Sequence, residues 1–428
     1  MITDMDPARF KTHSLTDVRV QRILSAALKA VDPAEAVRNH LPDVSGNGYG
    51  LGIGKASILM LTALAEEIHL SGALAISKHA SDFDRNLFPV IVGGHPVPNL
   101  DSLRAGERAL EFVSKLQEDD TLICLISGGG SALMTAPHEG ISLEDMQTLT
   151  SLLLSCGARI DEINTLRRQL DRVKGGGLAR ATKARVTSLI LSDVIGNPLE
   201  AIASGPTYPD PTTSKNALTI LKKYKLEKQA PNLIQNYLLE KLQQEPAAGD
   251  GGVSKRVTNL IVGDNKLAAQ AAMEMAQREG FDTEILTNSL QGEACEVGVM
   301  LVKQLHEETA KRKRPFCLIA GGETTVTIQG NGKGGRNQEL ALAAVNELQG
   351  MENMMLISFA TDGEDGPTDA AGAVVTGETC QRGKRLGLDP ADYLSRNDAY
   401  HFFEELDDLV KIGPSGTNVN DLVFLIAF

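Results

Sequence analysis

The chain has 428 residues, 42% of them hydrophobic, and a formal net charge of −13. This length and apolar content allow large buried cores in two or more domains. The negative charge disfavours nucleic acid or an anionic membrane as a main partner, and no apolar run reaches the ~18 residues of a membrane span. The five cysteines are scattered and no leader-like run opens the chain, so we expect reduced thiols and a cytoplasmic protein.

Apolar strand-like runs alternate with helical patterns, which is typical of α/β proteins. An opening helix is predicted from the apolar positions of residues 20–31. The runs "YGLGI", "ALAIS", "PVIVGG", "TLICLIS" and "VTSLILSD" then predict a mostly parallel sheet. After a break in composition at residues 243–256, "PFCLIAGGET", "TVTIQ", "MLISFATDG" and "DLVFLIAF" predict a mixed sheet. We therefore expect one domain at 1–250 and a second at 257–428. The stretch "VTNLIVGDN" and part of 257–300 could belong to the first domain instead.

The stretch "YGLGIGKAS" ends the first predicted strand and carries Lys55. It departs from a P-loop, because Tyr49 replaces the first glycine and Ala56 replaces the hydroxyl residue. Apolar residues at helical spacing over 58–68 predict a helix with Lys55 in its first turn. A cation there opposes the helix dipole unless an anion binds over the free N–H groups. The alternative is a solvated surface lysine.

The stretch "LICLISGGGSAL" runs from an apolar strand into three glycines flanked by two serines. Backbone without side chains lets N–H groups converge on phosphate oxygens, and the hydroxyls add donors. The alternative is a tight turn between a strand and a helix. The predicted phosphate-binding residues are Ser127, Gly128, Gly129, Gly130 and Ser131.

A second glycine-rich stretch, "RVKGGGLAR", adds Lys174 to the candidate ligands of a nucleotide. It follows a predicted helix whose inner face includes Ile163, Leu166 and Leu170. The alternative is that Lys174 and the glycine after it only end this helix, with a favourable charge and a glycine cap.

A third glycine-rich stretch, "GNGKGG", satisfies the GxGxxG pattern of dinucleotide-binding proteins. The preceding "TVTIQ" alternates polar and apolar residues, whereas the first strand of a dinucleotide fold is buried on both faces. The expected acidic residue is also misplaced, since Asp362 lies too far along the chain. Lys333 and Arg336 make the loop positive, and Arg336 repeats the position of Lys55 at a helix start. The two together suggest a clamp for a polyphosphate.

Four carboxylates within eight residues follow the strand "MLISFA", and the single carboxylate of Asp193 follows the strand "VTSLIL". Hard oxygen ligands at the carboxyl end of a strand suit Mg²⁺ with bound phosphates, and Mn²⁺ should substitute. Asp362 is the first candidate metal ligand and Asp365 the second; a solvated acidic turn is the alternative. Asp193 at the other strand end is a candidate general base or metal ligand.

Eight strings together resemble the two-domain glycerate 2-kinases, whose C-terminal module is called MOFRL. They span almost the whole chain in order: "GIGKAS", "HPVPN", "LISGGGSAL", "KGGGLA", "SDVIGNPLEAIASGPTYPDPTT", "GGETTVTIQGNGKGGRNQELAL", "TDGEDGPTDAAGAVV" and "GPSGTNVNDL".

The resemblance implies ATP-dependent phosphorylation of D-glycerate at its 2-hydroxyl, with Mg²⁺. It also implies a Rossmann-like three-layer N-terminal domain, a smaller mixed α/β domain and an active site in the cleft between them. Lys55 and Arg336 match positions that the family places in this cleft. Asn197 departs from the acidic residue expected in its turn, which puts a metal role for that turn in doubt.

Two other functions stay open at this point. Relatives labelled hydroxypyruvate reductases make an NAD(P)H-dependent reductase the second candidate, and a nucleotide-binding regulator without catalysis is the third. The expected partners are small molecules, D-glycerate and ATP. The oligomeric state is open, with a homodimer as one option.

Overall fold

The computed structural model describes residues 5–80, 82–244 and 255–428. The chain divides into two compact units, Pro33–Val262 and a second unit made of Met1–Asp32 with Gly263–Phe428. The expected division at 1–250 and 257–428 differs from these units chiefly at the N-terminus, which groups with the C-terminal half. Most of the break at 243–256 lies outside the described residues. No helix in the described ranges is long and apolar enough to cross a membrane.

The unit Pro33–Val262 is built on a six-stranded sheet in the order β3-β2-β1-β4-β5-β6. All strand pairs from β3 to β5 are parallel. In sheets of this order the chain reverses its direction of winding between β1 and β4, and ligands bind beyond the carboxyl ends of the strands. The Rossmann-like prediction is confirmed. The strands are β1 (Gly48–Ile53), β2 (Leu70–Ser77), β3 (Val90–Val92), β4 (Thr121–Ile126), β5 (Arg185–Leu191) and β6 (Val257–Gly263).

Helices cover both faces of this sheet, chiefly α3 (Ser57–Glu67) and α5 (Leu100–Ser114). Leu51 of β1 lies in the same buried cluster as the apolar residues of α5. On the opposite face a Cβ at Gly50 would lie 2.5 Å from Cδ1 of Leu61 in α3, so glycine allows this helix to pack closely. Alternate residues of one strand therefore serve two helical layers.

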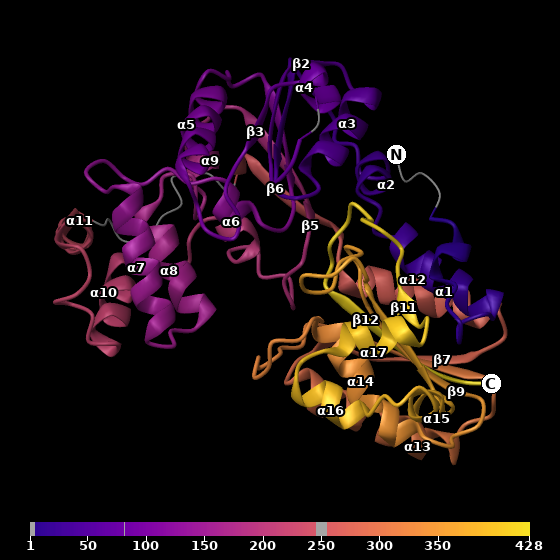
Figure 1. Ribbon diagram of the computed structural model, residues 1–428. Helices are drawn as coiled ribbons and strands as arrows, with labels where there is room; N and C mark the ends of the chain where they lie inside the picture. The colour runs from indigo at the N-terminus through magenta and orange to yellow at the C-terminus, as the bar shows by residue number, and fades with distance from the viewer. Residues whose placement is uncertain (1–4, 81, 245–254) are drawn as a thin grey trace. The chain divides into compact units, whose positions relative to one another are not determined.

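Four helices of the same unit form a separate bundle (Figure 1). α8 contacts each of the other three, and the bundle has its own apolar core, which includes Leu149, Leu166 and Leu221. The bundle helices are α7 (Leu143–Ser155), α8 (Ile160–Leu170), α10 (Ser214–Lys223) and α11 (Asn232–Gln244). The shorter helices of the unit are α2 (Pro33–Arg38), α4 (Asp82–Leu87), α6 (Gly130–Leu133), α9 (Gly177–Arg180) and the 3₁₀ turn η2 (Ile202–Ser204).

The second unit is built on a mixed sheet in the order β11-β10-β9-β12-β8-β7, as predicted. β12 pairs antiparallel with β8 and β9, whereas β7 pairs parallel with β8. The C-terminal strand is therefore central, which explains why all seven of its residues are buried. The strands are β7 (Asp282–Leu290), β8 (Phe316–Gly322), β9 (Met354–Ala360), β10 (Gly372–Thr376), β11 (Leu409–Val410) and β12 (Asp421–Ala427).

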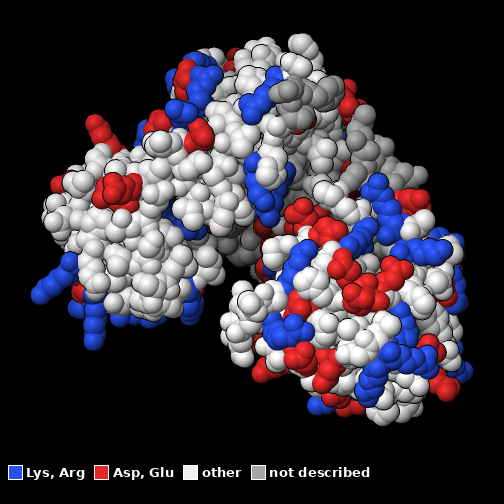
Figure 2. Space-filling view, in the orientation of Figure 1, with Lys and Arg blue, Asp and Glu red and all other residues white. Residues whose placement is uncertain are grey.

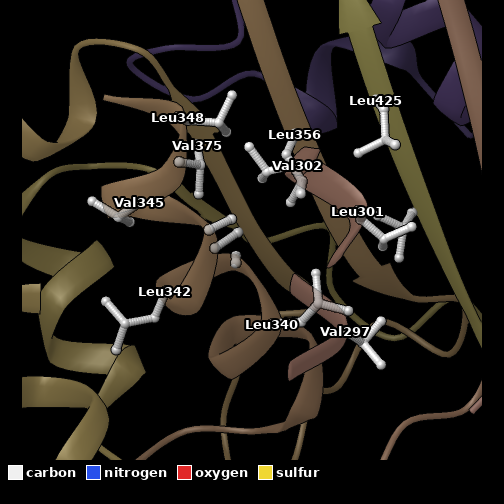
Figure 3. Packing of buried hydrophobic residues seen from close by; sticks show 14 of the residues in the cluster. Val297, Leu301, Val302, Leu340, Leu342, Val345, Leu348, Leu356, Val375 and Leu425 are labelled. Carbon is white, nitrogen blue, oxygen red and sulfur yellow. The ribbon is translucent and has the colours of Figure 1, made fainter. Parts of the chain in front are cut away.

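Two long helices pack against each other and against this sheet, α13 (Ala294–Thr309) and α14 (Arg336–Leu348). Figure 3 shows Val297 and Leu301 of α13 close to Leu340 of α14. A Cβ at Gly298 would overlap with the backbone of α14, so a glycine permits the close crossing of the helices. The other helices are η1 (Pro7–Phe10), α1 (Val18–Lys29), α12 (Asn265–Arg278), α15 (Thr379–Arg385), α16 (Pro390–Ser395) and α17 (Ala399–Glu405).

The N-terminal segment is fastened to this unit through the buried carboxylate of Asp408. Asp408 accepts hydrogen bonds from Oγ1 of Thr12 at 3.0 Å and from the backbone N of Ser14 at 2.8 Å. It also forms an ion pair with Arg382 at 2.6 Å. These long-range contacts explain why the opening helix groups with the C-terminal half of the chain.

The predicted strand "TVTIQ" is wrong. Thr325 makes an isolated bridge to Glu293, and the residues after it continue without strand pairing. Ile328 is 79% exposed, and the backbone N of Gly330 donates to Oδ1 of Asn397 at 2.9 Å. A side-chain acceptor thus replaces the neighbouring strand that a β-strand needs.

Charged side chains of both signs are intermingled on the face of the β7–β12 unit shown in Figure 2.

Candidate active site

The carboxyl ends of four parallel strands bring the candidate residues of the first unit to one edge of the sheet. Lys55 follows β1, the SGGGS loop (residues 127–131) follows β4 and Asp193 follows β5. His95, which we did not single out from the sequence, follows β3. This edge is where α/β sheets of this order bind ligands.

Lys55 lies just before α3 and not in its first turn, because the helix starts at Ser57 with Ala56 as its N-cap. The preceding Gly54 has a φ of 120°, and the backbone N of Lys55 donates to O of Gly128 at 3.0 Å. This bond joins the turn after β1 to the loop after β4. The side chain of Lys55 is exposed, with no ion pair to any described residue.

The glycines of the SGGGS loop are required by close contacts. A Cβ at Gly128 would overlap with the carboxylate of Asp193, and a Cβ at Gly130 would lie 2.7 Å from Cβ of Ala203. Gly129 has a φ of 86°, in the left-handed region. Within the described part of the chain, the N–H groups of these three glycines donate to no other residue. The loop therefore offers backbone donors to an anion.

The two serines of the loop have different partners. Ser127 is buried, and its Oγ accepts a hydrogen bond from the backbone N of Ala56 at 3.0 Å. Oγ of Ser131 lies 2.7 Å from Oγ of Ser204. Ser127 thus holds the turn that carries Lys55, while Ser131 is oriented by a residue that the sequence reading missed.

Ser204 belongs to a turn in which three successive residues have left-handed backbone. Ala203, Ser204 and Gly205 have φ values of 50°, 60° and 60°. Such a conformation is unfavourable for residues other than glycine and persists where the surroundings fix it. Here the carbonyl of Ser204 accepts from the backbone N of Gly175 at 2.9 Å. The strained turn therefore links the second glycine-rich stretch to the SGGGS loop.

The side chains of His95 and Lys55 both lie close to Gly129 of the SGGGS loop. A Cβ at Gly129 would be 3.2 Å from Cδ2 of His95 and 3.4 Å from Cγ of Lys55. Burial lowers the pKa of His95, and the positive charges of Lys55 and Lys78 lower it further. The imidazole is therefore neutral at neutral pH.

Lys174 is buried among partners of its own. Its Nζ forms an ion pair with Asp171 and donates to O of Met134 at 3.1 Å. Burial lowers its pKa, while Asp171 acts in the opposite direction. With 2% of its surface exposed, Lys174 joins the loops around residues 134 and 174, and these contacts favour a structural role over the predicted nucleotide contact.

Asn197 has a φ of 53°. Asparagine tolerates this left-handed conformation better than most residues, which gives a conformational reason for its presence in the turn after β5.

The second unit contains Arg336 at the first position of α14. Its guanidinium binds both oxygens of Asp421, at 2.5 and 3.0 Å, and Oε1 of Glu323 at 2.7 Å. Asp421 is buried, which raises its pKa, although Arg336 lowers it. Arg336 is thus at a helix start, as predicted, and already has two acidic partners.

Asp365 caps the same helix. Its carboxylate accepts from the backbone N of Asn337 at 3.1 Å and from the backbone N of Gln338 at 2.8 Å. Burial, followed by the negative charge of Asp421, raises the pKa of Asp365 to about 7. These contacts favour a structural role for Asp365 over the predicted metal role.

Asp362 is half-buried, and its Oδ1 accepts from the backbone N of Glu364 at 3.2 Å. Among the described residues, no three His, Cys, Asp or Glu side chains form a group that could hold a metal. The acidic loop therefore does not fit a metal cage made by protein alone.

The GxGxxG stretch packs against its own chain. A Cβ at Gly330 or Gly332 would overlap with the backbone of Arg396, and the backbone N of Lys333 donates to Oδ1 of Asp398 at 2.9 Å. Nζ of Lys333 lies 3.8 Å from the ring centre of Tyr400. The glycines thus serve an internal contact, and the dinucleotide interpretation loses its main support.

Two family models match the chain. Residues 19–239 match a domain of unknown function, DUF4147, and residues 316–421 match the MOFRL family. The D-glycerate 2-kinase of Thermotoga maritima is 40% identical over 97% of this chain and 99% of its own length. The glycerate 2-kinase of Pyrococcus horikoshii is 38% identical over 95% and 96%. A crystal structure of glycerate kinase from Thermotoga maritima aligns with a TM-score of 0.87 at 40% identity, covering 95% of this chain and 98% of the other.

The fold and these similarities define a kinase with an α/β sheet unit and a MOFRL unit. The chain belongs to the glycerate kinase family.

Proposed function

We propose that the protein transfers the γ-phosphoryl group of ATP to the 2-hydroxyl of D-glycerate. The observation that carries this proposal is the edge of the first sheet, where Lys55 lies beside a glycine loop with open N–H groups. Open backbone donors and a cation are suited to phosphate oxygens. Membership of a family with relatives named D-glycerate 2-kinase supplies the acceptor.

In this reaction the 2-oxygen of glycerate forms a bond to the γ-phosphorus, and the bond from this phosphorus to the bridging oxygen of ADP breaks. The SGGGS loop binds phosphate oxygens through its N–H groups, and Lys55 neutralises charge that develops on the transferring group. Preorganised donors and charges account for most of the catalysis in phosphoryl transfer.

Arg336 is proposed to act on the same phosphoryl group, as the family resemblance implies. Its contacts with Asp421 and Glu323 fix the guanidinium, and the two carboxylates partly offset its positive charge. Replacing Arg336 by alanine would leave the buried Asp421 without its cation, so Arg336→Lys is the better variant for testing its role. Asp193 stays a candidate for the proton acceptor or a metal-linked residue.

Mg²⁺ is proposed as the ion that accompanies ATP, with Asp362 as its protein ligand. The ion supplies charge neutralisation on the phosphates when bound. The cytoplasmic location and the oligomeric state stay predictions.

The role of Asp362 can be tested with a Mg²⁺ titration at saturating ATP. We expect Asp362→Asn to raise the Mg²⁺ concentration required for half-maximal rate. Asp365→Asn is the control, because its carboxylate caps α14: we expect lower stability without a change in the Mg²⁺ requirement. If the titration curves of wild type, Asp362→Asn and Asp365→Asn superimpose, Asp362 is not a ligand of the metal.

The class of reaction can be tested with two assays on the purified protein. We expect ADP formation that depends on D-glycerate, and no NADH oxidation with hydroxypyruvate, because the GxGxxG glycines pack against Arg396. NADH oxidation without ADP formation would replace the kinase proposal by the reductase.

A further inference from the structure

We infer that His95 is a further catalytic residue, which accepts the proton of the attacking glycerate hydroxyl. This inference rests on the proposed function. It assigns to His95 the role of general base, for which the sequence offered Asp193 as a candidate.

The first observation is the position of His95. It follows β3 at the same edge of the sheet as Lys55 and the SGGGS loop, and its ring lies against Gly129. The loop before it is fixed, because the backbone N of Gly94 donates to Oγ of Ser102 at 2.9 Å and a Cβ at Gly93 would overlap with O of Leu133. The imidazole is thus held beside the groups proposed to bind the transferring phosphoryl.

The second observation is that the imidazole has capacity for a ligand. In the described ranges it makes no hydrogen bond to another residue, although it is partly buried. A partly buried polar ring usually has a partner, so a substrate group is a suitable one.

The charges around His95 keep it in the form that a base requires. Lys55 and Lys78 are the charged groups that act on it, and both favour the neutral ring. Burial acts in the same direction. The ring can therefore accept a proton at neutral pH, and a protonated ring would be destabilised beside the two lysines.

Position also favours His95 over Asp193. Lys55, the residue proposed to act on the transferring group, lies next to His95 across Gly129, whereas Asp193 packs against Gly128. The attacking hydroxyl must be adjacent to the phosphorus, so its proton acceptor has to lie close to the groups that bind the transferring phosphoryl.

The step is balanced. The hydroxyl proton passes to a ring nitrogen of His95 as the bond from oxygen to phosphorus forms, and ADP leaves with the electron pair of the broken bond. The imidazolium then releases the proton to solvent.

The test compares wild type, His95→Gln, Asp193→Asn and His306→Gln. His306 is an exposed residue of α13 in the other unit and is the matched histidine control. The rate of ADP formation from D-glycerate is measured between pH 5 and 8, and circular dichroism verifies folding. The wild-type rate should fall with acid through a pKa below the ordinary value of 6.5. His95→Gln should lose this dependence and reduce kcat by about 10²-fold or more, with a small change in the KM for D-glycerate.

Two further measurements complete the test. Asp193→Asn should retain the acid limb whatever its rate, and the Cε1 proton of His95, assigned by its loss in His95→Gln, should titrate at the same pKa. His95→Gln with the wild-type rate, or with an unchanged acid limb, would overturn the inference while leaving the kinase intact. A wild-type protein that forms no ADP from D-glycerate would overturn the proposed function and this inference with it.

Discussion

Lys55→Ala should reduce the turnover of D-glycerate by ~10²-fold or more, the effect of losing one preorganised donor at a developing charge. Lys55 has an exposed side chain and no ion pair to a described residue, so its removal leaves no buried group without a partner. The backbone bond from Lys55 to Gly128 does not depend on the side chain. Steady-state kinetics with ATP and D-glycerate, together with a thermal melt, measure both effects.

Lys183→Ala is the matched control, because Lys183 is an exposed lysine of the same unit before β5. It should retain normal kinetics and stability. If Lys55→Ala behaves like Lys183→Ala, Lys55 is a solvated surface lysine and the proposed anion site is wrong.

Asp408→Ala should destabilise the β7–β12 unit by about 3–5 kcal/mol, as expected for breaking a buried ion pair. The change leaves Arg382 without its acidic partner and removes the acceptor for Thr12 and Ser14. The N-terminal segment should then detach more readily. Urea denaturation followed by circular dichroism measures the loss, and the accessibility of residues near the N-terminus to protease measures the detachment.

Asp392→Ala is the control for this change, since Asp392 forms an exposed ion pair with Arg396 in the same unit. Exposed pairs contribute about 0–1 kcal/mol, so its midpoint should hardly move. Equal midpoints for the two variants would show that Asp408 does not hold the segment.

The sheets could be predicted because their strands are almost wholly apolar. "TLICLIS" and "DLVFLIAF" become β4 and β12, and every residue of both strands is buried. Helix α14 begins at Arg336, where a helix start was predicted, and its apolar residues recur at helical spacing. Local pattern decides these elements, since each buries a continuous face.

The other features of the fold depend on contacts between residues that are far apart in the sequence, and the local sequence pattern does not reveal these contacts. Asp408 binds residues 12–14 to the C-terminal half of the chain. No change in composition along the sequence indicates this contact. The sequence around Lys174 is typical of a ligand-binding lysine, whereas the structure shows its ion pair with Asp171.

The candidate site was predicted in part for the same reason. Glycine-rich loops after strands are visible in the sequence, so Lys55 and the SGGGS loop could be proposed. His95 and Ser204 were not proposed, although both lie in strings that carry the family resemblance, because the left-handed turn at Ser204 and the contact of His95 with Gly129 appear only in three dimensions. The position of His95 directly after a predicted strand of the parallel sheet was an available signal.

Phosphorus NMR of the product formed from D-glycerate, ATP and Mg²⁺ tests the central claim most directly. Transfer to the 2-hydroxyl attaches the phosphate to a carbon that carries one hydrogen, so the proton-coupled signal of the new monoester should be a doublet. A triplet would place the phosphate on the 3-hydroxyl, and the absence of any new phosphate monoester would contradict the kinase account itself.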